Sequence, residues 1–382
     1  MKIFRVILIF TMALFLAGCW DSKEVGDLAI VTGMGIDAGA EKDEIKLVLQ
    51  VGDMSKGQKD SQGETEPIIL DSTGVNIQAA IESLKIQSTR SLYFSHNQVI
   101  LIGEEQARRG IACFLDWFVR NENTRMEVPL IVAKQNAKAV LQIKTTQNNI
   151  SAFAVKSMLD NDVAPSFYSK INLLSFLSTH INKTTCPIAP IVVSKIDSDK
   201  NTILEIEGTA IFKEGKMIGE LGIHQTEGLM WILGQSPKRN IIVKNDDGNA
   251  ALAIVSSQSS ISSDYIDGEF INEVNIKATF RISELAGFKD KHSDNIIPFI
   301  NDLLKDDMYT KIGSAIQSSK NYKSDIFGFG SALYKKSPEK FEQIVENFDE
   351  IYSKSPYRIN LEVEVLDTGK INGILTDHQN KG

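Results

Sequence analysis

Apolar and polar residues follow the periods of both strands and helices along this chain. Residues 28–37 and 44–51 carry alternating apolar side chains on either side of a polar segment that contains glycine, which predicts a β-hairpin. Farther on, apolar residues recur every three or four positions between 77 and 84, which predicts a helix. Asn76 precedes this helix and suits its N-cap.

Two continuous apolar runs, residues 99–103 and 128–133, predict buried strands. The segment between them, residues 104–119, places its large apolar side chains on one helical face. Strand, helix and strand at this spacing are typical of a βαβ unit. The N-terminal half is therefore predicted to be mixed α/β.

Strands dominate the second half of the chain. They are predicted at 203–213, 216–222, 240–244, 250–260, 269–285 and 358–366, with helices at 226–233, 295–319 and 338–352. A segment with two prolines, residues 181–190, precedes this change in pattern, so we expect a domain boundary near residues 190–202. The predicted fold class is α+β, with an N-terminal α/β domain (28–195), a C-terminal domain of antiparallel sheet plus helices (200–370) and a tail (371–382).

The first residues have the pattern of a bacterial lipoprotein signal. Lys2 and Arg5 precede an apolar stretch at 6–15, and the small residues Leu16-Ala17-Gly18 come directly before Cys19. A transmembrane helix needs ~20 apolar residues, more than this stretch supplies. We therefore predict a signal peptide at 1–18, a lipidated tether at 19–27 and a diacylglycerol thioether on Cys19. An ordinary secretory cleavage site is the alternative.

The predicted mature chain is acidic. Removal of Lys2 and Arg5 leaves 39 of the 41 basic residues against 49 acidic ones, a formal net charge of −10. No run of lysine and arginine interleaved with aromatic residues is present to bind phosphates. The composition argues against nucleic acid as a partner.

Two cysteines remain once Cys19 is lipidated. Cys113 lies on a predicted helix and Cys186 precedes a proline, so the sequence does not decide whether they come within disulfide distance. The alternatives are one disulfide bond or two thiols that pack as small apolar groups.

No arrangement of residues typical of an enzyme occurs in the sequence. The five histidines lack metal-ligand spacing, and no Gly-x-Ser-x-Gly motif is present. Residues 33–38 resemble a dinucleotide-binding turn, but a charged hairpin follows them instead of a helix. We therefore expect no cofactor, no metal and no catalysis, and predict a membrane-tethered interaction protein.

Three aromatic residues are candidate contact sites. Phe327 and Phe329 alternate with small residues between two helices, and Trp231 lies on a short apolar helix. Packing in the core is the favoured interpretation of all three. Contact with a partner protein is the alternative.

Five segments together resemble the Ger(x)C family, the lipoprotein C subunits of bacterial spore germinant receptors. They lie in the same order over nearly the whole predicted mature chain, at residues 18–37, 95–103, 208–213, 226–234 and 325–330. The last four include the sequences SHNQVILIG, GTAIFK, TEGLMWILG and DIFGFG.

This resemblance implies a lipoprotein on the outer face of the cell membrane, in this case the spore's inner membrane. Its partners would be integral-membrane receptor subunits, with which it would take part in nutrient-triggered spore germination. The resemblance also implies a three-domain α+β arrangement, so residues 28–195 could hold a separate subdomain around the early hairpin. A solute-binding lipoprotein that captures a nutrient directly is the alternative function.

Overall fold

The computed structural model of the chain describes residue 3 and residues 27–52, 66–145, 148–160, 170–182, 184–235, 240–288 and 293–366. The predicted lipidation site Cys19, all but residue 3 of the signal peptide, all but residue 27 of the tether, and the tail 371–382 lie outside the described residues.

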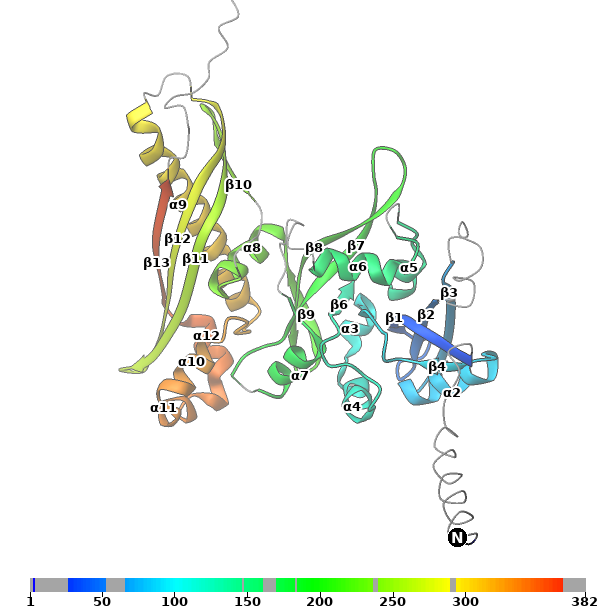
Figure 1. The fold of residues 1–382 in the computed structure, drawn as a ribbon. Helices are drawn as coiled ribbons and strands as arrows, with labels where there is room; N and C mark the ends of the chain where they lie inside the picture. The colour runs from blue at the N-terminus through cyan, green and yellow to red at the C-terminus, as the bar shows by residue number, and fades with distance from the viewer. Residues whose placement is uncertain are drawn as a thin grey trace, which may run out of the picture.

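Two β-sheets with helices packed on them organise the fold, which confirms the predicted α+β class (Figure 1). The first sheet has the order β3-β2-β1-β5-β6-β7-β8-β9, with β4 paired to β1, and the second has the order β10-β11-β12-β13. The strands are β1 (Leu28–Ala38), β2 (Ile45–Gly52), β3 (Ile68–Gly74), β4 (Ser91–Tyr93), β5 (Ile100–Gly103), β6 (Leu130–Ala133), β7 (Ile188–Ile196), β8 (Thr202–Lys213), β9 (Lys216–Leu221), β10 (Ile241–Asn245), β11 (Gly248–Ile266), β12 (Glu269–Gly287) and β13 (Tyr357–Leu366).

The helices lie on both faces of the first sheet and on one face of the second (Figure 1). They are α2 (Ile77–Gln87), α3 (Glu104–Arg109), α4 (Ala112–Arg120), α5 (Ala137–Gln142), α6 (Ser151–Asp160), α7 (Leu173–Ile181), α8 (Ile223–Ile232), α9 (Ser293–Asn321), α10 (Phe329–Lys336), α11 (Pro338–Glu342) and α12 (Phe348–Lys354), with the short 3₁₀ helix η3 (Val345–Asn347) before α12.

The N-terminal half has the predicted hairpin and βαβ unit. β1 pairs antiparallel with β2, and the central strands β1, β5, β6 and β7 run parallel to one another. The predicted helix at 104–119 is instead two helices, α3 and α4. The chain breaks at Gly110, whose φ of 137° lies outside the helical region and suits glycine alone.

In the C-terminal half, α9 packs along one face of the second sheet. The sheet is antiparallel across β10, β11 and β12, as predicted, while β13 joins parallel to β12. A parallel neighbour is possible because α9 to α12 intervene and carry the chain back along the sheet. The predicted helix at 338–352 is divided into α11, η3 and α12.

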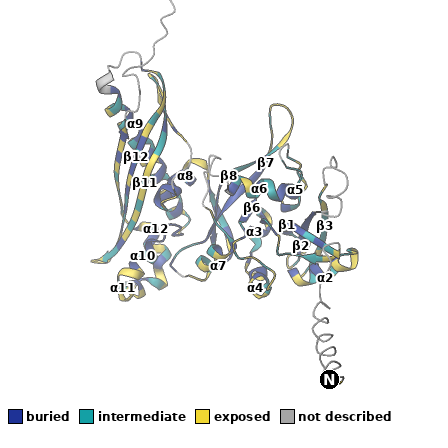
Figure 2. Cartoon of the chain, viewed as in Figure 1, coloured by how far each residue is buried: buried dark blue, intermediate teal, exposed yellow. Residues whose placement is uncertain are grey.

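The predicted domain boundary falls in the turn between β7 and β8. These strands pair antiparallel from Ile188↔Ile211 to Ile196↔Thr202, so one sheet contains residues on both sides of the boundary. The division into domains stays a prediction. Figure 2 shows buried residues along the central strands of the first sheet and exposed residues at the tips of the long hairpins.

Candidate functional site

The segment Asp325–Gly330 forms a turn around a buried carboxylate. Asp325 is 1% exposed, and its side chain accepts backbone N–H groups of Phe327 at 3.0 Å, Gly328 at 2.9 Å and Gly330 at 2.7 Å. Its backbone oxygen accepts the N–H of Cys186 at 2.6 Å. Burial raises the pKa of Asp325 to about 6, although these N–H donors favour the charged form. The carboxylate therefore fixes the start of α10, and the backbone oxygen of the same residue ties this turn to the loop before β7.

The two phenylalanines of this turn lie in the core. Phe327 is 4% exposed and Phe329 is 0% exposed, and their ring centroids are 5.6 Å apart. Phe329 also lies 6.4 Å from the ring of Tyr352 on α12. In this structure the rings therefore join α10 to α12 and present almost no surface to a partner.

The third candidate, Trp231, is also buried. It is 1% exposed and lies on α8, with its ring 6.1 Å from that of Phe280 on β12. These positions match the core-packing interpretation of the three aromatic residues. A partner contact by any of them would require the core of the second sheet to open.

A buried ion pair, which the sequence did not reveal, joins α8 to α9. Lys311 Nζ lies 2.9 Å from Glu227 Oε1 and 2.6 Å from Asp307 Oδ2. Glu227 is 1% exposed, and the Lys311 side chain is 11% exposed. The helices touch closely here, because a Cβ on Gly228 would lie 2.2 Å from the backbone oxygen of Lys311. Residues 227 and 228, which belong to the family-like segment 226–234, thus form a contact between the two helices.

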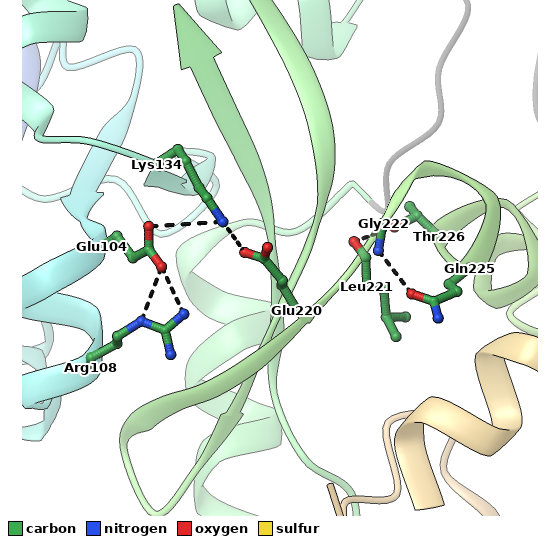
Figure 3. A network of polar contacts seen from close by, with 8 residues as sticks. All are labelled: Glu104, Arg108, Lys134, Glu220, Leu221, Gly222, Gln225 and Thr226. Carbon is green, nitrogen blue, oxygen red and sulfur yellow. Dashed lines mark hydrogen bonds and ion pairs between the residues drawn. The ribbon is translucent and has the colours of Figure 1, made fainter. Parts of the chain in front are cut away.

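A surface network joins α3 to the end of β6 and to β9 (Figure 3). Glu104 at the start of α3 accepts hydrogen bonds from Arg108 at 3.0 and 2.7 Å. Lys134, directly after β6, lies 3.9 Å from Glu104 and forms an ion pair with Glu220 of β9. These partly exposed charges bind α3, β6 and β9 to one another.

The same figure shows how the first sheet leads into α8. The side chain of Gln225 accepts the N–H of Gly222 at 3.0 Å and donates to Ser318 of α9 at 2.7 Å. The hydroxyl of Thr226 donates to the backbone oxygen of Leu221 at 3.3 Å. The end of β9 in the first sheet is therefore held to α8 and, through Gln225, to α9, which packs on the second sheet.

The part of the chain that the structure describes contains no group of three or more histidine, cysteine, aspartate or glutamate residues arranged to hold a metal ion. It also contains no helix that is long and apolar enough to cross a membrane. Cys113 is exposed and Cys186 is half-buried, and both are free thiols. Burial raises the pKa of Cys186 to about 11, which disfavours its reactive thiolate.

Comparison with known proteins places both halves of the chain in one family. Residues 21–194 match the family described as spore germination protein N-terminal domain, and residues 207–369 match spore germination B3/GerAC like, C-terminal. Spore germination protein KC of Bacillus subtilis (strain 168) is 26% identical, with 97% of each chain covered. Spore germination protein B3 of the same organism is 21% identical, with 95% of this chain and 97% of that protein covered.

A solved structure has the same fold. The crystal structure of the GerBC protein matches with a TM-score of 0.58 and 16% identity, over 90% of this chain and 100% of that chain. The matches of residues 21–194 and 207–369 to the two spore germination family models confirm the family resemblance inferred from the five sequence segments. This chain belongs to the Ger(x)C family of GerAC-like spore germination proteins.

Proposed function

We propose that this protein is a lipid-anchored, noncatalytic subunit of a spore germinant receptor. In this proposal Cys19 carries the lipid, the folded body lies at the outer face of the spore's inner membrane, and integral-membrane receptor subunits are its partners. The observation that carries the proposal is the match of both halves of the chain to spore germination families. The signature segments support a structural role, because their described side chains pack, cap and pair within the fold.

The short tether limits where such a body can act. From Cys19 to Asp27 the chain advances by eight residues, which span at most ~3.6 Å each, or about 29 Å in total. β1 begins directly afterwards, at Leu28, beside β4. The start of β1 in a protein tethered in this way stays within about 29 Å of the bilayer surface, which keeps the first sheet near the membrane and favours assembly with membrane subunits.

Co-purification from spore membranes tests the proposal. Tagged wild-type protein should bring integral-membrane germinant receptor subunits with it and should carry diacylglycerol on Cys19 by mass spectrometry. Cys19→Ala should lose the lipid and most of the co-purifying subunits, whereas Cys113→Ala, at an exposed free thiol, should retain both. Failure of the wild type to bring any receptor subunit would contradict the proposal. Calorimetric binding of an amino acid or sugar by the purified protein would instead support direct nutrient capture.

A further inference from the structure

The strand β11 is paired on one side along its whole length but on the other side only near its start. β12 pairs with it from Gly248 to Ile266. On the opposite edge, β10 pairs only with residues 248–252. The end of α8 then covers Ser259, whose hydroxyl donates to the backbone oxygen of Ile232 at 2.8 Å. Beyond that point, residues 260–266 have no strand paired to this edge within the described ranges.

A groove of about 670 Å³ runs beside this open edge, between β11 and α10. Ile261, Ser262 and Ser263 line its strand side. The helix side is lined by Gly328, directly before α10, and by residues 331, 332 and 335 of α10, whose spacing of three and four places them on one face of the helix. Three of these four are glycine, serine or alanine, so the helix leaves room beside the strand edge. Neighbouring strands need a spacing of about 4.8 Å.

The end of the groove is positively charged in an otherwise acidic protein. Lys335 and Lys336 both line it. Lys336 and Lys340 each pair with Asp264, at 2.7 and 2.6 Å, so two lysines share one carboxylate and Lys335 adds a third positive charge. The whole chain carries a formal net charge of −8. This local excess of positive charge favours an occupant that carries carboxylates.

We propose that the open edge of β11 binds an extended, acidic segment of an integral-membrane receptor subunit as an added strand. The backbone of the segment would hydrogen-bond to the edge at 260–266, its small or apolar side chains would face Ser331 and Ala332, and a carboxylate would pair with Lys335. A second copy of this chain is disfavoured as the occupant, because pairing of two such edges would bring both lysine groups together. The inference rests on the proposed receptor assembly and identifies where that assembly is made.

Site-specific photo-crosslinking in spores tests this inference on the full-length protein. Benzoylphenylalanine at the exposed Ser262 should give an ultraviolet-dependent adduct with an Asp- or Glu-containing extracytoplasmic segment of a membrane subunit, identified by mass spectrometry. The same group at Lys277, which is exposed on β12, should give no such adduct.

Two variants then test the chemistry of the groove. Ala332→Trp fills it and should reduce the Ser262 adduct about tenfold. Lys335→Glu, a surface change that preserves packing, should reduce it by a similar factor. Tyr334→Trp is the matched control, because Tyr334 lies on the same helix and is already 48% exposed, and it should leave the adduct unchanged.

The outcomes separate this inference from the proposed function. If membrane subunits still co-purify but Ser262 gives no adduct, or crosslinks to a second copy or to residues 367–382 of the same chain, the inference fails and the receptor assembly stands. An adduct that is insensitive to both Ala332→Trp and Lys335→Glu also overturns it. If no membrane subunit co-purifies with wild-type protein, the proposed function itself fails.

Discussion

Replacement of Lys311 by methionine tests the contact between α8 and α9. The change removes the positive charge beside Glu227 but keeps an unbranched apolar side chain of similar length. Glu227 is 1% exposed and its Oε1 lies 2.9 Å from Lys311 Nζ, so the buried carboxylate would lose this cation. Breaking a buried ion pair in this way costs about 3–5 kcal/mol. Asp307, whose side chain is 32% exposed, would remain hydrated and add little to this cost.

Urea denaturation followed by the fluorescence of Trp231 measures this loss. Trp231 is 1% exposed and lies on α8, so it reports on the affected core. Substitution of Trp20 and Trp117 by phenylalanine removes the other two tryptophan signals. In that background Lys311→Met should lower the free energy of unfolding of the second-sheet core by the predicted 3–5 kcal/mol.

A second substitution provides the control for charge. Glu227→Gln combined with Lys311→Met removes the buried charge and should recover most of the lost stability. Lys195→Met breaks an exposed pair with Glu205, where the side chains are 42% and 45% exposed, and should leave stability nearly unchanged. The reasoning is refuted if Lys311→Met costs no more than Lys195→Met, or if the double variant is as unstable as the single one.

Three further changes have definite expected results. Gly228→Ala should destabilise the protein by ~1–3 kcal/mol in the same assay, because its Cβ would lie 2.2 Å from the Lys311 oxygen. Because of Asp325, the free energy of unfolding should fall by ~3 kcal/mol as the pH rises from about 4 to about 6. Burial raises the pKa of Asp325 from 3.8 to about 6 in the folded state, which therefore holds the proton more tightly than the unfolded state does. Asp325→Asn should flatten that part of the stability profile. In maleimide labelling of folded protein, Cys113 should react and Cys186 should react only on unfolding; a mass that lacks two free thiols would show a disulfide instead.

Local sequence patterns predicted much of this fold because they reflect local burial. The alternation at 28–37 and 44–51 matches β1 and β2, which are buried along most of their length. The apolar runs around 100 and 130 match β5 and β6, in which every residue is buried. Asn76 caps α2 as expected, accepting the N–H of Ala79 at 2.8 Å.

The proposed binding edge and the buried ion pair depend on contacts distant in sequence, which local patterns do not show. β11 extends to Ile266, beyond the predicted end at residue 260, because pairing with β12 holds a serine-rich segment in the sheet. The edge of β11 is open because β10 is short and pairs only with residues 248–252. The sequence of β11 itself does not show how long its neighbouring strand is. Glu227 gave one usable signal, an acidic residue just before the apolar residues of its helix. Its partner, Lys311, lies 84 residues away.

Germination of spores that carry an altered anchor tests the central claim most directly, namely that Cys19 holds this folded body at the membrane as part of a germinant receptor. Spores with Cys19→Ala should fail to respond to the nutrient that triggers wild-type spores. A transmembrane helix fused ahead of residue 20 should restore the response without any lipid. Normal germination of Cys19→Ala spores, or failure of the fused helix to rescue a protein that is present at wild-type amounts in the membrane, would contradict the account.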